Sequence, residues 1–306
     1  MMFNYPICTF SELRDCASLE STKRVCVVQA EDEVALEAAA GAIDLDIADV
    51  TLVGDERKVV RLAEEKGYFE LLDRACIVDS STAEDCAAKL AADGAVDILL
   101  KGHLRTDQLL KAVLNKDYGL RTGRLLSDVL LYEDRLGEKP RLVGITDGGL
   151  NVLPTLENKR AIIHNAIEVM QRIGISEPLI ALLSATESVS DAVPSTVDAM
   201  QLTEIAKSGV FGAAQVYGPL ALDNALLVSA AKAKGISNPV AGRADCLVVP
   251  SIEAGNMLGK SVKFIAQSSC AHVVVGAQVP ILIPSRVESA QDKINSIALG
   301  VLNVQE

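Results

Sequence analysis

Short runs of valine, isoleucine and leucine alternate with segments of helical periodicity along the whole chain. Several of the helical segments begin with Pro, Ser, Thr or Asp and end at Gly, as helix caps predict. Apolar runs separated by helices are typical of parallel sheets that are covered by helices, so the sequence predicts an α/β fold. The runs that we expect to form strands lie at residues 24–30, 49–54, 76–79, 96–101, 125–132, 141–147, 178–184, 212–218, 245–250, 271–276 and 279–284.

The length of 306 residues suits one large domain or two ordinary ones, and we expect two. The best candidate for a boundary is the segment YEDRLGEKPR at residues 132–141. This segment is charged, contains Gly and Pro, and has no apolar periodicity.

Net charge and cysteine usage exclude several classes of protein. The net charge of −12 argues against a nucleic-acid surface, because a phosphate backbone requires an excess of Lys and Arg. The apolar stretches are shorter than the ~20 residues that span a bilayer, and the N-terminal MMFNYPICTFSELRD has no secretory pattern, so we expect a cytoplasmic protein. The odd number of cysteines without C-x-x-C pairs indicates reduced thiols. Three separated histidines without H-E-x-x-H spacing give no support for a metal site.

The segment PSRVESAQDK at 284–293 follows the apolar run 279–283 directly. Ser285 and Glu288 have the spacing of a capping box, which predicts a helix from this point. Seven residues of helix turn through ~700°, so Ser285 and Asp292 would then share one face. The simpler interpretation is that Ser285 caps the helix while Arg286 and Asp292 are solvated surface charges.

Ligands of open α/β sheets bind beyond the carboxyl ends of the strands. In an acidic chain an anionic substrate would need a local group of cations. Basic residues of this kind cluster at and after the end of the expected strand 96–101. The same residues could equally form a solvated face. These residues are Lys101, Arg105, Lys111, Arg121 and Arg124.

The segment AGNMLGKS at 254–261 is close to a phosphate-binding P-loop, but Ala254 occupies the first glycine position. Asn256 and Lys260 are therefore either ligand contacts or a helix cap and a surface lysine. We find no G-x-G-x-x-G after the early strands, which weakens a dinucleotide site.

Taken together, the motifs after the strands resemble the phosphate acetyltransferase / phosphate butyryltransferase family. The similarity runs in order from about residue 95 to the end of the chain. It is carried by KGHLRT (101–106), GLRTGRLLSDV (119–129), DGGLNVLPTLENKRAIIHNAI (147–167), YGPLALDNAL (217–226), KGISNPVAGRADCLVVPSIEAGNMLGK (234–260) and VGAQVPILIPSR (275–286).

The resemblance implies a two-domain fold of the isopropylmalate-dehydrogenase-like type, with mostly parallel sheets and an interdomain cleft. Residues 1–139 with 277–306 would form the N-terminal domain, and residues 140–276 the second one. The implied reaction is the reversible transfer of a short acyl group, butyryl or acetyl, between coenzyme A and inorganic phosphate. Coenzyme A would be a substrate, with no bound cofactor and no metal. The implied assembly is a homodimer or a higher homo-oligomer.

The resemblance also implies the site. Ser285, Arg286 and Asp292 would be catalytic, with Asp292 taking the proton of the thiol. An ordinary Asp, with a pKa near ~3.9, is a weak base for a thiol with a pKa near ~8.5, so either burial raises the pKa of Asp292 or a nearby cation such as Arg286 stabilises the thiolate. The substrate-binding residues would be Lys101, Gly102, Thr106, Lys111, Arg121, Asn256 and Lys260.

The chain departs from the family pattern at four positions. Pro284 replaces a common Thr, Arg105 and Asp128 stand where many relatives have His, and Lys111 stands where acetyl-type members tend to have Arg. Lys111 and the short length favour the butyryl type. The alternative is a catalytically weak relative that binds acyl-CoA or acyl phosphate as a regulator. An NAD-dependent dehydrogenase of the same fold would need cofactor and metal-ligand residues that we do not find in the sequence.

Overall fold

The computed structural model describes residues 5–137 and 139–305, which form two compact units. Residues 1–4, part of the N-terminal segment considered for a signal, lie outside the described residues. The first unit contains residues up to Thr9 and Leu125–Ser269; the second contains Phe10–Arg124 and Cys270–Glu306. These units divide the chain after residues 9, 124 and 269, whereas the predicted domains divide it after residues 139 and 276.

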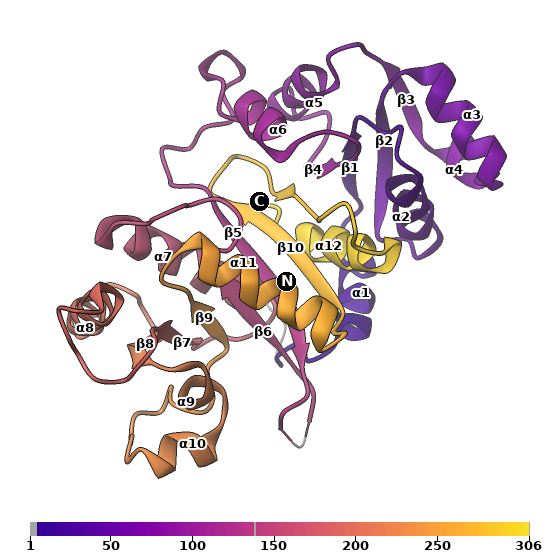
Figure 1. Cartoon of the computed structure of the whole chain (residues 1–306). Helices are drawn as coiled ribbons and strands as arrows, with labels where there is room; N and C mark the ends of the chain where they lie inside the picture. The colour runs from indigo at the N-terminus through magenta and orange to yellow at the C-terminus, as the bar shows by residue number, and fades with distance from the viewer. Residues whose placement is uncertain (1–4, 138, 306) are drawn as a thin grey trace. The chain divides into compact units, whose positions relative to one another are not determined.

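The sheet of the second unit is parallel except for one strand (Figure 1). Its order is β3-β2-β1-β4-β11-β10, and β10 runs antiparallel to β11. The registers pair Val28 of β1 with Lys101 of β4, and Leu282 of β11 with Leu100 of β4. The strands are β1 Lys23–Val28, β2 Ala48–Gly54, β3 Cys76–Asp79, β4 Ile98–Lys101, β10 Cys270–Val275 and β11 Ile281–Leu282.

Helices of the second unit pack around this sheet. The last helix, α12, contacts β10, α1 and α2 (Figure 1). All of its residues except Gln291 are buried. A helix that is buried on every side belongs to a core. The helices of this unit are α1 Phe10–Ser18, α2 Glu33–Asp44, α3 Glu56–Lys66, α4 Phe69–Arg74, α5 Ala83–Ala92, α6 Thr106–Val113, the 3₁₀ turn η1 Lys116–Tyr118, and α12 Ala290–Leu302.

The first unit has a sheet of order β5-β6-β9-β7-β8, in which only the β5–β6 pair among these described strands is antiparallel. Its strands are β5 Ser127–Asp134, β6 Arg141–Thr146, β7 Leu179–Leu183, β8 Gln215–Leu220 and β9 Cys246–Val248. Its helices are α7 Leu156–Arg172, α8 Pro194–Ala206, α9 Leu222–Leu226, α10 Val228–Ala233, α11 Ile252–Lys260 and the π-helical turn η2 Ser261–Ile265.

The start of the last helix differs from the prediction. The helix begins at Ala290, and its N-cap is Ser289, whose Oγ accepts a hydrogen bond from the Asp292 N–H at 3.2 Å. Asp292 Oδ2 accepts from the Ser289 N–H at 3.1 Å, so the capping box is formed by Ser289 and Asp292. Ser285 and Glu288 belong to the preceding turn, where the Glu288 N–H donates to the Ser285 carbonyl. The prediction that Ser285 and Asp292 share one helical face is therefore wrong.

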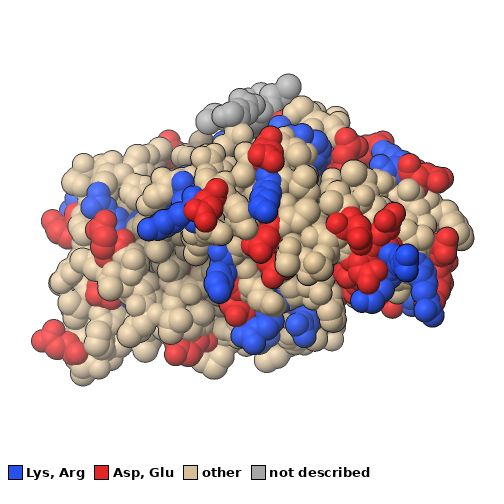
Figure 2. Space-filling model, turned by 90° about the horizontal axis from the view of Figure 1, so that it is seen from above, with Lys and Arg blue, Asp and Glu red and all other residues tan. Residues whose placement is uncertain are grey.

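Acidic and basic side chains are interspersed on the face of the protein shown in Figure 2. Within the part of the chain that the structure describes, we find no helix with the length and hydrophobicity needed to cross a bilayer. The mixed α/β fold with mostly parallel strands agrees with the fold class expected from the sequence.

Candidate active site

The candidate site lies at one edge of the sheet of the second unit. Because β1, β4 and β11 are parallel, their carboxyl ends meet at the same edge. Lys101 ends β4, Ser285 and Arg286 follow β11, and Asp32 follows β1. The sheet thus brings together residues that are far apart in the sequence.

Gly102 is required by a close approach of two backbone segments. Its N–H donates to the Val28 carbonyl at 2.9 Å, and the next N–H, of His103, donates to the Gln29 carbonyl at 2.8 Å. A Cβ atom on Gly102 would collide with the carbonyl oxygens of both Val28 and Gln29. The glycine therefore lets the chain turn immediately after Lys101.

Lys101 is only 4% exposed, and its Nζ lies 3.5 Å from the Leu104 carbonyl. Burial lowers the pKa of the Lys101 ammonium, and the charges of Lys293 and Arg286 lower it further. Asp32 and Glu288 act on this pKa in the opposite direction. Three cations interact electrostatically here, and two of them, Lys101 and Lys293, are deeply buried. An anion would stabilise such a group.

Lys293 is a member of this cationic group that the sequence analysis did not identify. The side chain is 2% exposed, and its Nζ lies 3.6 Å from Asp32 Oδ1. The same Asp32 oxygen caps α2 by accepting from the Ala35 N–H at 2.8 Å. A signal was present in the sequence: Lys293 falls three residues after Ala290 and four before Ile297, on the apolar stripe of the helix.

Asp292 is 1% exposed and accepts hydrogen bonds at both oxygens. Oδ2 accepts from the Ser289 hydroxyl at 2.6 Å and from the Ser289 N–H, while Oδ1 accepts from the Cys270 N–H at 3.0 Å. These donors stabilise the ionised carboxylate. Ser285 is partly exposed and Arg286 is exposed, so both lie on the accessible side of the turn that precedes α12.

The remaining predicted contacts lie on other segments. Thr106 is the first residue of α6, Lys111 is exposed on the same helix, and the exposed Arg121 forms a backbone bridge with Ala277. Asn256 and Lys260 are exposed on α11, which belongs to the first unit.

A buried carboxylate pair in the first unit was also not identified from the sequence. Asp147, directly after β6, is 3% exposed and accepts from the N–H groups of Gly149 and Leu150 at 2.8 and 2.9 Å. Burial raises the pKa of Asp147, and the nearby charge of Asp128 raises it further. A Cβ atom on Gly149 would lie too close to the Asp128 carboxylate, and glycine avoids this contact because it has no side chain.

A family model described as "Phosphate acetyl/butaryl transferase" matches residues 57–301 of the chain. The chain belongs to this family. The resemblance seen in the motifs is thereby confirmed for the phosphate acetyl/butyryl transferases.

Relatives of both acyl types are similarly close. A probable phosphate butyryltransferase of Bacillus subtilis (strain 168) is 40% identical over 95% of this chain and 96% of the relative. A phosphate acetyltransferase of Rhizobium meliloti is 39% identical over 96% of this chain and 92% of the relative. Overall identity to these family members therefore does not separate the butyryl from the acetyl type.

Solved structures of the phosphate acyltransferases have the same fold. A branched-chain phosphotransacylase from Enterococcus faecalis V583 superposes with a TM-score of 0.80 at 30% identity, covering 93% of this chain and 100% of that one. A phosphotransacetylase from Streptococcus pyogenes, at 20% identity, has the same TM-score of 0.80 and shows the likeness of fold.

Proposed function

We propose that this protein catalyses the reversible transfer of a short acyl group between coenzyme A and inorganic phosphate. Membership of the phosphate acetyl/butyryl transferase family supports this proposal. The observation that carries it is the cationic group of Lys101, Arg286 and Lys293 at the carboxyl edge of β4 and β11. In a chain with a net charge of −12, buried lysines gathered at a strand edge are best explained by an anionic substrate.

In the proposed reaction the coenzyme A sulfur attacks the carbonyl carbon of an acyl phosphate, and the bond from that carbon to the phosphate oxygen breaks. Arg286 and Lys101 stabilise the charge on the phosphate and on the developing oxyanion. The Ser285 hydroxyl donates a further hydrogen bond, and Asp292 accepts the thiol proton. Lys293, held by Asp32, keeps positive charge next to Lys101.

We propose that the other predicted contacts bind the substrates. Gly102 acts through the backbone, while Thr106, Lys111 and Arg121 contact phosphate groups. Asn256 and Lys260 on α11 contribute from the first unit. We also propose that the protein has a two-domain, isopropylmalate-dehydrogenase-like fold with an interdomain cleft. The proposed domains are residues 1–139 plus 277–306 and residues 140–276.

The reaction as proposed needs no bound cofactor, because coenzyme A enters and leaves as a substrate. We propose a homodimer or a higher homo-oligomer, as the family resemblance implies. We also propose that it is located in the cytoplasm, as expected from the sequence.

The test is turnover by the purified protein. We expect coenzyme A-dependent release of phosphate from acetyl, butyryl or branched-chain acyl phosphate. Arg286→Gln should lower kcat/KM by roughly 10²- to 10³-fold, the usual effect of removing a donor that stabilises transition-state charge. Arg135→Gln is the matched control, because Arg135 is also exposed but pairs with Glu133 at 2.9 Å in the first unit. Binding of coenzyme A without phosphate release from any of these substrates would instead identify a regulator.

A further inference from the structure

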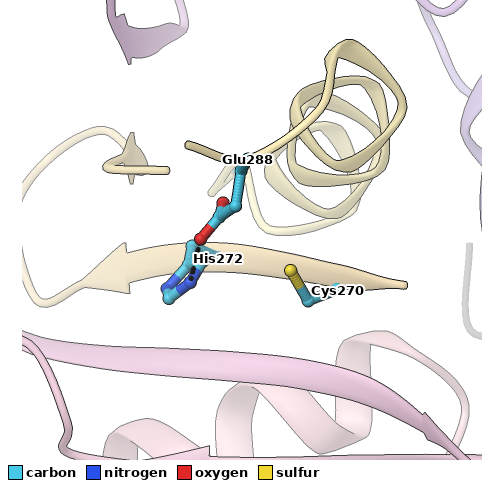
Figure 3. Close-up of side chains that lie close together, drawn as sticks. All are labelled: Cys270, His272 and Glu288. Carbon is cyan, nitrogen blue, oxygen red and sulfur yellow. Dashed lines mark ion pairs between the residues drawn. The ribbon is translucent and has the colours of Figure 1, made fainter. Parts of the chain in front are cut away.

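Cys270, His272 and Glu288 form a cluster at the start of β10 (Figure 3). One ligand atom of each, the cysteine sulfur, a ring nitrogen and a carboxylate oxygen, lies within 4.8 Å of the other two. Cys270 and His272 are two residues apart on a strand, so their side chains point to the same face of the sheet. Glu288 approaches them from the turn before α12, as Figure 3 shows.

The cluster is almost completely buried. Cys270 is 1% exposed, Glu288 is 7% exposed, and the side chain of His272 is 14% exposed. Glu288 Oε1 lies 3.4 Å from His272 Nε2. The other carboxylate oxygen, Oε2, is buried and has no hydrogen-bond partner among the described residues. A buried carboxylate oxygen without a partner is unfavourable, and a bound cation would remove that cost.

The chemistry of the three side chains is that of a zinc site. Thiolate sulfur, imidazole nitrogen and carboxylate oxygen are the three ligand types that zinc takes in proteins, at about 2.3, 2.0 and 2.1 Å from the ion. At tetrahedral angles such ligands are roughly 3.5 Å apart. His272 Nε2 and Glu288 Oε1 already have this separation, at 3.4 Å, so it is the Cys270 sulfur that needs to approach, by at most about 1 Å. A thiolate and a carboxylate together carry two negative charges, which balance the two positive charges of a divalent ion.

We propose that Cys270, His272 and Glu288 bind a divalent transition-metal ion of the zinc type. The three residues supply three ligands of a tetrahedral site and leave the fourth position for water. The Cys270 thiol gives its proton to solvent as the metal–sulfur bond forms, so affinity for the metal increases with pH. This proposal differs from the expectation drawn from the sequence, in which the spacing of the histidines gave no support for a metal site.

The bound ion would join β10 to the turn that carries Ser285 and Arg286. Glu288 is two residues after Arg286, and the Cys270 N–H already donates to Asp292 at the first turn of α12. Occupancy of the site therefore fixes the position of the turn. Without the ion, the negative charge of Glu288 stabilises the protonated form of Lys101. The bound ion neutralises that charge and so removes this stabilisation.

The experiment uses the full-length, metal-free protein. Zn²⁺ titration by calorimetry should give one site per chain, and Co²⁺ should produce the near-ultraviolet absorption of a thiolate–cobalt bond. Cys270→Ala should abolish the thiolate band, and His272→Gln and Glu288→Gln should each weaken Zn²⁺ binding by more than about tenfold, since even changes around a metal's direct ligands cost that much. The matched control is Cys26→Ala, a strand cysteine of the same unit that is 0% exposed, which should bind Zn²⁺ like the parent.

Three results would overturn the proposal. They are Zn²⁺ binding that survives in Cys270→Ala, a Co²⁺ complex without the thiolate band, and the absence of a stoichiometric site in the parent protein. If Cys270→Ala does not fold, as judged by circular dichroism, His272→Gln and Glu288→Gln decide, because both keep side chains of similar size. All of these measurements detect binding, so they are independent of whether the protein transfers acyl groups.

Discussion

Asp292 has two roles in the proposed site, and they make opposite demands on its carboxylate. As part of the capping box of α12 it accepts from the Ser289 and Cys270 N–H groups, and these hydrogen bonds favour its ionised form. As the acceptor of a thiol proton it must become protonated during turnover. The two roles are compatible if the nearby cations stabilise the thiolate, because this lowers the free-energy cost of moving the proton from the thiol to Asp292.

Asp292→Asn separates these roles when it is compared with a matched variant. We expect Asp292→Asn to lower kcat by roughly 10²- to 10⁴-fold, because an amide cannot accept the thiol proton. Ser289→Ala removes the other half of the capping box and should reduce the free energy of unfolding by about 1 kcal/mol. The kcat of the folded Ser289→Ala protein should remain within about threefold of the parent. Steady-state kinetics and urea titrations of both variants provide the measurements. Equal losses of kcat in the two variants would mean that Asp292 acts only by positioning the turn.

Individual residues of the site differed in how far the sequence could predict them. Positions at the end of a strand or shortly after it, such as Lys101 and Arg286, could be placed because the carboxyl ends of parallel strands lie at the same edge of the sheet. Lys293 was missed although it falls on the apolar stripe, because a lysine in a helix is usually exposed and the burial of this one depends on α2 packing against α12. The helix cap was misplaced because two successive patterns, Ser285 with Glu288 and Ser289 with Asp292, both fit a capping box.

At the scale of elements, each predicted strand corresponds to one of the eleven strands in the described residues. Strand ends differ by up to a few residues, which is expected because hydrogen bonding and not hydrophobicity defines them. The directions of β5 and β10 were not predictable. An apolar run reads the same in a parallel and an antiparallel strand, so the pattern carries no information on direction.

The β4–α6 connection depends on Gly102, which gives a test against a second glycine. In Gly102→Ala the new methyl group meets backbone carbonyl oxygens that cannot move alone. We expect a loss of about 2 kcal/mol in the free energy of unfolding, within the range of overpacking. Gly41→Ala on α2 is the comparison: its Cβ would lie 2.5 Å from the Ile294 Cδ1 atom, the flexible end of a side chain. There the gain of up to about 1 kcal/mol in helix propensity offsets the crowding. Chemical denaturation of both variants measures the difference; an equal loss in the two would refute the explanation for Gly102.

At the scale of the whole molecule, composition alone does not locate the points at which the chain passes from one unit to the other. The charged segment at 132–141 has the composition of a linker, yet Asp134 and Arg141 are paired residues of the antiparallel strands β5 and β6. Composition cannot distinguish a hairpin loop from a linker, because both are polar and rich in turn residues. The chain enters a different unit after residues 9, 124 and 269.

This connectivity predicts that a contiguous piece of the second unit does not fold alone. Residues 10–124 lack β10, β11 and α12, so β4 loses one of its two neighbouring strands and α2 loses a buried packing partner. We expect this fragment to show no cooperative thermal transition by circular dichroism. A second polypeptide contains residues 10–124 and 270–306, with a Gly-Ser linker between residues 124 and 270. This polypeptide should show a cooperative thermal transition. A cooperative transition of 10–124 alone would show that the C-terminal segment is dispensable.

The place of β11 in the sheet has a consequence for the growing chain on the ribosome. Translation proceeds at roughly 5–20 residues per second, and most of the protein is made before Ile281 and Leu282 reach β4. Until then one side of β4 is an unprotected strand edge, open to pairing with another nascent chain. The same late segment carries Ser285 and Arg286, so in the proposed mechanism the growing chain cannot recognise its substrates before this segment is translated.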